Sequence, residues 1–76
     1  MDYIPHLVNR LKEIRLERGL TQEALGQAVG VTRQTVIAVE KGKFVPSVKL
    51  ALQLARFLGR PLEEVFWLEA GKGGPP

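Results

Sequence analysis

Two adjacent side chains with long hydrogen-bonding groups, Arg33 and Gln34, begin a short segment that has helical periodicity. Arginine can form two hydrogen bonds with O6 and N7 of guanine, and glutamine can do the same with N6 and N7 of adenine. Val36 and Val39 fall on the opposite side of such a helix. Turning these valines inward leaves an outer face of five residues: Arg33, Gln34, Ile37, Ala38 and Lys41. A solvated surface helix would more typically carry Glu–Lys pairs four residues apart, which this segment lacks. The layout favours a helix that reads base edges in the major groove.

The other side chains that could do chemistry give no catalytic or metal site. The chain has no cysteine and one histidine, His6, which excludes disulfides, thiol chemistry, a zinc finger and a multi-histidine metal site. Ser47 has no histidine base near it in the sequence and is interpreted as a helix cap. Two pairs of carboxylates are interpreted as solvated helix surface, since nothing supplies a cleft: Glu13 with Glu17, and Glu63 with Glu64. We therefore expect a binding module without a cofactor, and not an enzyme.

Length and charge distribution point to an anionic partner. Seventy-six residues give room for one small domain. The net charge is only +3, but residues 30–60 hold six basic residues and one acidic residue, a local net charge of +5. A cationic face of this kind suits double-stranded DNA better than a membrane surface, because basic and apolar residues do not form one long amphipathic helix. The sequence shows no signal-peptide core, so we expect the chain to work in the cytoplasm, at the nucleoid.

Capping residues and glycines divide the chain into helices. Thr21, Thr32 and Ser47 are N-cap types directly before helical patterns, and Pro61 fits a first helical position. Glycines follow four of the patterns, where a left-handed residue often ends a helix. These signals predict five helices and no convincing strand: residues 6–18, 22–29, 33–41, 48–58 and 62–68. The fold class is therefore all-α, with one domain over residues 1–69 and a flexible tail over residues 70–76.

Apolar spacing supplies a core for a compact five-helix bundle. Leu20 and Val31, in the tight turns, are expected to close the ends of this core. The expected core residues share one face of each helix: Leu7, Leu11, Ile14, Leu25, Val29, Val36, Val39, Leu50 or Ala51, Leu54, Ala55, Leu58, Val65 and Phe66. Helices 22–29 and 33–41 are joined only by Gly30, Val31 and Thr32, which forces the sharp crossing of a helix-turn-helix. Gly26 lies inside the first of these helices, and there it indicates a close approach of the second.

Residues from Arg10 to Phe66 resemble the lambda repressor/Cro-like (XRE-type) helix-turn-helix family. The resemblance is carried by RLKEIRLERGLTQEALGQAVGV, TRQTVIAVEKGKFVPS and LALQLARFLGRPLEEVF. It implies a lambda repressor-like fold and sequence-specific binding of operator DNA, usually as a homodimer. Carried onto this chain, it places Arg33, Gln34 and Ala38 towards base edges, with Thr32 and Thr35 alongside. It places Gln22 against a phosphate, with further phosphate contacts from Lys43 and from Lys41 nearby.

Two residues depart from the pattern of the family on the outer face. Ala38 offers only a methyl group where many relatives have a longer polar side chain, and Ile37 is apolar where a small polar residue is common. Either can touch a thymine methyl group, so part of the base reading is expected to be apolar.

A buried ion pair is expected between Arg15 and Glu40. Arg15 follows Leu11 by one turn on an inward stripe, and Glu40 follows Val36 by one turn. Two opposite charges at inward positions are expected to pair, because an isolated buried ion is very costly. The resemblance implies the same bridge, which would orient the helix of residues 33–41.

Phe66, Trp67 and Leu68 are three consecutive large apolar residues on a short terminal helix, and they cannot all face one core. Phe66 is the simplest core residue of the three, which leaves Trp67 or Leu68 at the surface. We expect this edge, with help from Phe44 or nearby residues, to form a symmetric dimer contact. The leading hypothesis is a transcriptional repressor that binds DNA as a homodimer. The alternative is an antitoxin or adaptor that binds a protein partner through the same edge.

Overall fold

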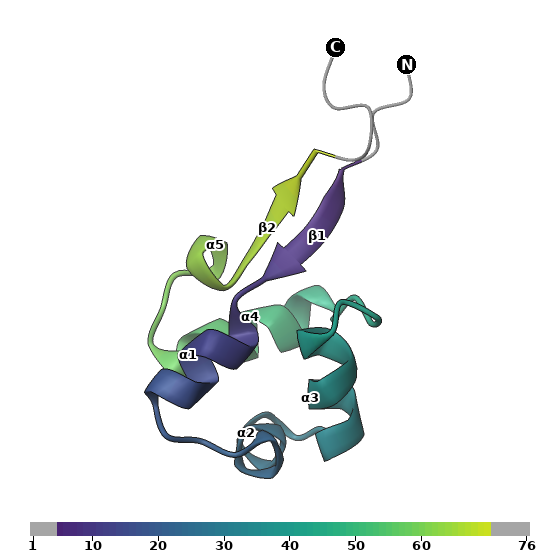
Figure 1. The fold of residues 1–76 in the computed structure, drawn as a ribbon. Helices are drawn as coiled ribbons and strands as arrows, with labels where there is room; N and C mark the ends of the chain where they lie inside the picture. The colour runs from purple at the N-terminus through teal and green to yellow at the C-terminus, as the bar shows by residue number, and fades with distance from the viewer. Residues whose placement is uncertain (1–4, 71–76) are drawn as a thin grey trace.

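The computed structural model describes residues 5–70, and within them the chain forms five helices and two strands (Figure 1). The elements follow one another along the chain in this order: β1 His6–Asn9, α1 Leu11–Glu17, α2 Gln22–Val29, α3 Arg33–Glu40, α4 Val48–Leu58, α5 Leu62–Val65 and β2 Phe66–Glu69. The predicted five-helix fold is confirmed. The tail expected over residues 70–76 falls almost wholly outside the described residues, and its boundary stays a prediction.

The two strands correct the expectation that the chain forms only helices. β1 and β2 pair antiparallel, with His6 opposite Glu69 and Asn9 opposite Phe66. This two-stranded sheet projects from the helical body in Figure 1. The first helix therefore begins at Leu11 and not at residue 6, and the last helix ends at Val65 and not at residue 68. The backbone N–H of Arg10 donates to the carbonyl of Val65 at 3.0 Å, so the strands enter and leave the bundle side by side.

Predicted caps stand at the starts of three helices. The hydroxyl of Thr21 accepts from Ala24 N at 3.0 Å, and that of Ser47 accepts from Leu50 N at 3.1 Å. Thr32 does the same for Thr35 N at 3.3 Å. Each bond satisfies an amide that the helix itself leaves unpaired, which fixes where α2, α3 and α4 begin. Pro61 lies one residue earlier than expected, at the cap position of α5.

The core lies where the five helices meet, and it contains the residues that periodicity predicted. Twelve apolar residues are buried in one cluster: Leu11, Ile14, Leu25, Val29, Val36, Val39, Leu50, Leu54, Ala55, Leu58, Val65 and Phe66. Leu50 is the buried member of its pair, whereas Ala51 is only partly covered. Leu7, Leu20 and Val31 pack partly buried against the cluster. Leu7 reaches it from β1, not from a helix, because alternate side chains of a strand also share one face.

The turn between α2 and α3 depends on two glycines. Gly30 has φ 79°, the left-handed conformation that an L-residue adopts only with strain. Gly26 lies against the turn, and a Cβ atom added there would stand 2.7 Å from the carbonyl oxygen of Val31 and 3.3 Å from that of Thr32. The close approach expected at Gly26 is therefore confirmed, and its partner is the backbone that enters α3. This contact sets the crossing of the two helices.

Candidate nucleic-acid interface

α3 presents a polar outer side on a helix whose inner side is fixed. Val36 and Val39 are buried in the core. Arg33 and Gln34, one turn earlier, are exposed at the N-terminal end of the helix. Thr35, Ile37 and Ala38 are half-buried, so they leave room for another surface to come close. The structure thus brings together the residues expected at base edges, with the exposed cap Thr32 beside them.

The side chains of Thr32 and Thr35 contact each other at the start of α3. The hydroxyls of Thr32 and Thr35 lie 3.2 Å apart, in addition to the capping bond. This contact keeps the first turn of α3 in a fixed conformation, so that Arg33 and Gln34 project from a rigid support. A hydroxyl that is already paired is less free to read a base edge, and the two threonines act first on the helix itself.

A hollow of about 480 Å³ separates the first turn of α2 from the start of α3. It is lined by Arg15, Thr21, Gln22, Glu23 and Arg33. Unpaired amides and the helix dipole favour an anion at the start of a helix. Gln22 was predicted as a phosphate contact on resemblance, and it lies at this hollow with its amide nitrogen 3.1 Å from Oε1 of Glu40. Nothing in the residue pattern indicated that contact.

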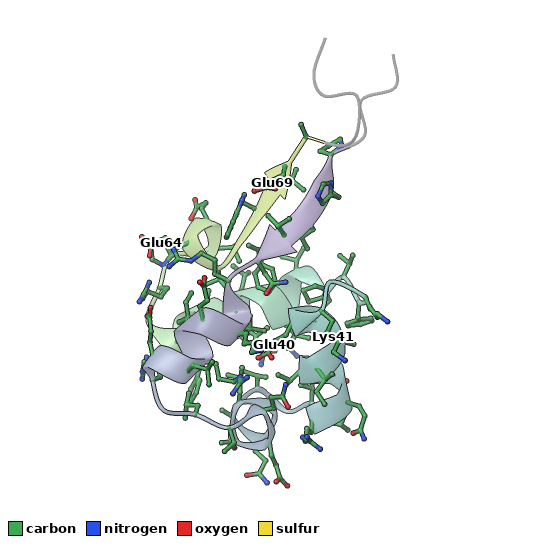
Figure 2. All side chains as sticks on the ribbon, in the orientation of Figure 1. Glu40, Lys41, Glu64 and Glu69 are labelled. Atoms are coloured by element: carbon green, nitrogen blue, oxygen red, sulfur yellow. The ribbon has the colours of Figure 1, made fainter. Side chains whose placement is uncertain are left out.

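Lys41 and Lys43 follow α3 and are both exposed. The amide of Lys43 donates to the carbonyl of Ala38 at 2.9 Å, and that of Gly42 donates to Val39 at 3.0 Å. These bonds tie the connection to the last turn of α3, so Lys43 keeps a fixed place relative to Arg33 and Gln34. Figure 2 shows Lys41 at the end of α3, next to the inward-lying Glu40.

The predicted ion pair between Arg15 and Glu40 is present in the interior. Nε of Arg15 lies 2.6 Å from Oε2 of Glu40, and the side chains are 7% and 4% exposed. Nη2 of Arg15 makes a second contact with Oε1 at 3.3 Å, and Nη1 donates to the carbonyl of Leu20 at 2.8 Å. The pair ties α1 to α3. Among residues 5–70, every buried side-chain nitrogen and oxygen has a partner.

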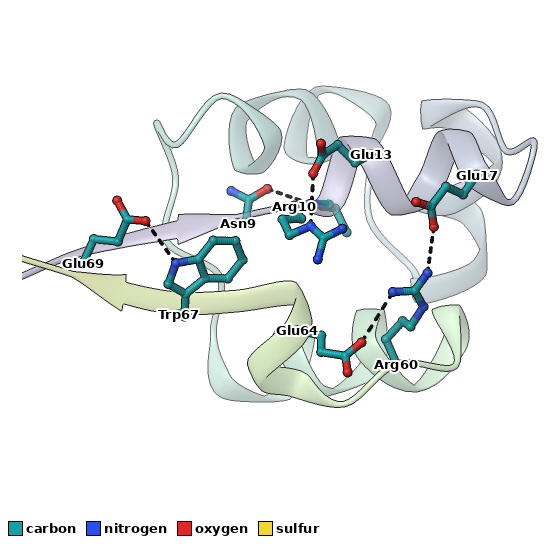
Figure 3. Close-up of polar contacts among 9 residues, drawn as sticks. Asn9, Arg10, Glu13, Glu17, Arg60, Glu64, Trp67 and Glu69 are labelled. Carbon is teal, nitrogen blue, oxygen red and sulfur yellow. Dashed lines mark hydrogen bonds and ion pairs between the residues drawn. The ribbon is translucent and has the colours of Figure 1, made fainter.

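Asn9 is a positioning residue that sequence reasoning missed. Its Nδ2 donates to the carbonyl of Val39 at 3.0 Å. Its Oδ1 accepts from the amide of Leu11 at 3.0 Å, the contact drawn from Asn9 in Figure 3. One side chain therefore starts α1 and also joins β1 to the end of α3. Asparagine just before an apolar helical stripe signals a nearby helix start, although the cap position of α1 is Arg10, one residue later.

Three of the acidic side chains on the surface are engaged in ion pairs. Glu13 pairs with Arg10 at 3.1 Å, and Glu17 and Glu64 pair with Arg60 at 2.7 and 3.4 Å (Figure 3). Within the described part of the chain, no three His, Cys, Asp or Glu side chains gather as a metal site. These three carboxylates pair with Arg10 and Arg60, and not with Arg33, Lys41 or Lys43. No helix among residues 5–70 has the length and apolar character to span a bilayer.

The three apolar residues expected at the dimer edge lie on a strand and not on a helix. Phe66 is buried in the core, so its side chain is not available to a partner, which corrects its place among the contact residues. Trp67 is half-buried, and its Nε1 donates to Glu69 at 3.2 Å. Leu68 is 64% exposed. The other large apolar residues exposed on α4 and in the connection before it are Phe44, Val45, Val48, Leu52 and Phe57. Together with Leu68 we call them the exposed apolar set.

Comparison with known proteins places this geometry among regulators. The HTH_3 pattern, described as helix-turn-helix, matches residues 11–65. The HTH-type transcriptional regulator YgzD of Bacillus subtilis, itself uncharacterised, is 54% identical over 61 residues, which are 80% of this chain and 92% of YgzD. The cryptic phage CTXphi transcriptional repressor RstR of Vibrio cholerae is 35% identical over 57 residues, covering 75% of this chain and 51% of RstR.

A solved structure shares the fold. The restriction-modification controller protein C.AhdI of Aeromonas hydrophila superposes with a TM-score of 0.68 at 38% identity. The superposition covers 72% of this chain and 80% of C.AhdI. The helical body described above is therefore similar to that of C.AhdI, whose crystal structure is known.

Proposed function

Because the chain belongs to the HTH_3 (XRE/Cro-C1 type) family of helix-turn-helix DNA-binding transcriptional regulators, we propose that it represses transcription by binding an operator sequence through α3. The family regulates transcription and is not enzymatic, as the sequence predicted. The observation that carries the proposal is the exposure of Arg33 and Gln34 at the start of a helix whose valines are buried. A helix anchored in this way can enter the major groove without rearranging.

Base reading is assigned to six residues of α3 and its cap. Arg33 and Gln34 are the bidentate side chains: Arg33 is expected to donate to O6 and N7 of guanine, and Gln34 to donate to N7 and accept from N6 of adenine. Ile37 and Ala38 present carbon to the groove, which suits the methyl group of thymine. The full set is Thr32, Arg33, Gln34, Thr35, Ile37 and Ala38. The half-buried members set how closely the helix approaches, and the exposed Arg33 and Gln34 distinguish one base from another.

Phosphate contacts are assigned to Gln22, Lys41 and Lys43, which flank α3 on two sides. Gln22 lines the hollow at the start of α2, and the two lysines lie directly after α3. Contacts to phosphate fix the register of a protein on the duplex and supply much of its affinity. This affinity is expected to fall steeply as salt rises, because each lysine releases bound counterions from the DNA.

We infer that the working form is a homodimer. One helix with two or three base contacts, each worth about 1–3 kcal/mol, discriminates weakly among sites. Two copies that bind half-sites about 34 Å apart would double the sequence that is read. The exposed apolar set and Trp67 are assigned to the contact with the second copy, since large apolar residues left in water favour association.

The same surface favours a second candidate, an antitoxin or adaptor that binds a protein partner. Val48 is 75% exposed and Leu52 is 50% exposed on one side of α4, and neither packs in the core. Association with a different protein would cover them equally well. In that case the protein would be a monomer when purified alone, and DNA binding would depend on the partner.

Selection of bound sequences from a random duplex library tests the proposed function. A repressor of this kind should enrich one sequence with two related half-sites, and the selected duplex should compete far better than a mixed-sequence duplex. Enrichment of no sequence, together with recovery of a protein partner that is needed for binding, would favour the second candidate. Placing the selected site over a promoter and measuring transcription then distinguishes a repressor from an activator.

A further inference from the structure

Three helices meet at the carboxylate of Glu40. Arg15 comes from α1, Glu40 from α3 and Gln22 from the first position of α2. Oε2 of Glu40 accepts from Nε of Arg15 at 2.6 Å. Oε1 accepts from Nη2 of Arg15 at 3.3 Å and from Nε2 of Gln22 at 3.1 Å. The ion pair is thus one part of a three-residue cluster whose outermost member is Gln22.

The contact with Glu40 fixes which end of the Gln22 amide turns inward. A carboxylate that is engaged in an ion pair, as Glu40 is with Arg15, only accepts hydrogen bonds. An amide group has an NH₂ end that donates and an oxygen end that accepts. The NH₂ group of Gln22 must therefore face Glu40, because the opposite orientation would bring two oxygens together.

One N–H of Gln22 is left for a second acceptor. The NH₂ group has two donors, and the carboxylate of Glu40 takes one of them. Gln22 also lines the hollow of about 480 Å³ with two exposed charges, the cation of Arg33 on α3 and the carboxylate of Glu23. A phosphate oxygen that enters this hollow would meet an N–H whose direction is already set.

We propose that Glu40 is a positioning residue for DNA binding: it orients the Gln22 amide so that a donor, and not the carbonyl oxygen, faces the phosphate backbone. The proposal rests on the phosphate contact proposed for Gln22. It gives the buried carboxylate a role beyond holding α1 and α3 together. The ligand group is a backbone phosphate of duplex DNA, and no base is read.

Replacing Glu40 by glutamine separates this role from a structural one. The new amide has nearly the same shape, but it can donate to the oxygen of Gln22 and so let the Gln22 amide turn over. The carbonyl oxygen would then face the phosphate and repel it. A role confined to stability would lower the midpoint of unfolding and would leave the affinity of the folded fraction for DNA unchanged.

A double-mutant cycle in DNA affinity tests the proposal. The probe is a fluorescent, mixed-sequence duplex about 30 base pairs long, which spans two half-sites, titrated at a temperature where each variant is folded. We expect Gln22→Ala to weaken binding about tenfold, the ratio that corresponds to one hydrogen bond to a charged group. We expect Glu40→Gln to weaken binding similarly in the parent chain, and not at all in the chain that already carries Gln22→Ala. The salt dependence should stay unchanged in both variants, since a neutral amide displaces no counterion.

Three results decide against the positioning role. Equal losses from Glu40→Gln in both backgrounds would show that Glu40 acts through α3 and not through Gln22. A Gln22→Ala variant that binds as tightly as the parent would show that Gln22 makes no phosphate contact. The proposed DNA-binding function would still stand in that case, because the parent binds the duplex. A parent that does not bind any duplex would overturn both proposals.

If Glu40→Gln does not fold, the side-chain amide of Gln22 in the parent protein gives the answer by nuclear magnetic resonance. We expect one of its two N–H protons to exchange slowly with water in the free protein. The other should shift when the duplex is added. Two protons that exchange equally fast, or a pair that the duplex leaves unmoved, would contradict the proposal.

Discussion

The guanidinium of Arg15 and the carboxylate of Glu40 make two contacts, at 2.6 and 3.3 Å, across the space between α1 and α3. Both side chains are almost wholly buried. This pair connects the first helix of the bundle to the helix that carries Arg33 and Gln34. The placement of the side chains that we propose read DNA therefore depends on a charge pair in the interior.

Arg15→Ala should lower the free energy of unfolding by about 3–5 kcal/mol, because it leaves the buried charge of Glu40 without its partner. The loss also removes the donor to the carbonyl of Leu20. Chemical denaturation followed by circular dichroism measures the change. Arg10→Ala is the matched control: its pair with Glu13 is exposed, and it should change stability by no more than about 1 kcal/mol. Equal midpoints for the two variants would contradict the buried pair.

Gly26→Val should destabilise the protein by about 1–3 kcal/mol, because even a Cβ atom at this position would press on the backbone oxygen of Val31. The turn would have to open, and α3 would move relative to α2. Ala28→Val is the control on an exposed position of the same helix, where only a small difference in helix propensity applies. Thermal unfolding of both variants measures the difference. A Gly26→Val protein as stable as the Ala28→Val protein would show that the turn can move freely.

Sequence reasoning succeeded where the determinants are local or are forced by burial. The caps Thr21, Thr32 and Ser47 act on amides three residues away, so a short stretch of sequence contains the whole interaction. Arg15 and Glu40 were paired correctly because two inward charges of opposite sign have few alternatives.

The two-stranded sheet could not be predicted in the same way, because its strands are four residues long and some sixty residues apart. Leu7 fits the helical stripe of Leu11 and Ile14, and it also fits an alternating strand, so periodicity alone did not decide. The contact between Gln22 and Glu40 was missed for a related reason. Helical periodicity says which side a residue occupies, but not what the end of a long polar side chain reaches.

Asn9→Ala should destabilise the protein by about 1–2 kcal/mol, because one side chain accepts from the amide of Leu11, the first residue of α1, and donates to the carbonyl of Val39. Its loss leaves the carbonyl of Val39 and the amide of Leu11 without these partners. His6→Ala is the control on the exposed end of the same strand, and it should stay within about 0.5 kcal/mol of the parent. Unfolding midpoints of the two variants, measured side by side, test the prediction. A change no larger than that of the control would show that β1 is held by strand pairing alone.

Leu52→Glu and Val48→Glu should convert the proposed homodimer into a monomer, because they place a charge on both copies of a self-complementary surface. Glutamate at position 48 stands in the first turn of α4, where the helix dipole favours a negative charge, so the fold itself should not suffer. Leu16→Glu on α1 is the control, since Leu16 is also exposed but lies outside the exposed apolar set. Sedimentation at several protein concentrations gives the masses. The homodimer is excluded if the parent sediments as a monomer at high micromolar concentration without DNA.

Gln34→Ala and Lys43→Ala should weaken DNA binding in different ways, and the difference is the sharpest test of how the interface divides its work. Gln34 is exposed beside Arg33 at the start of α3, so its loss should reduce discrimination by about 1–3 kcal/mol at one base pair of the selected site. Lys43 lies after α3, held by its backbone bond to Ala38, and is proposed to contact phosphate, so its loss should weaken selected and mixed-sequence duplexes nearly equally. It should also lower the slope of log affinity against log salt by about 1, whereas Gln34→Ala should leave that slope unchanged. Titration of both duplexes at about 50 and 200 mM salt measures the discrimination and the salt slope of each variant. If the two variants lose the same affinity on both duplexes, α3 does not read sequence through Gln34, because a contact to a base edge must depend on which base is there.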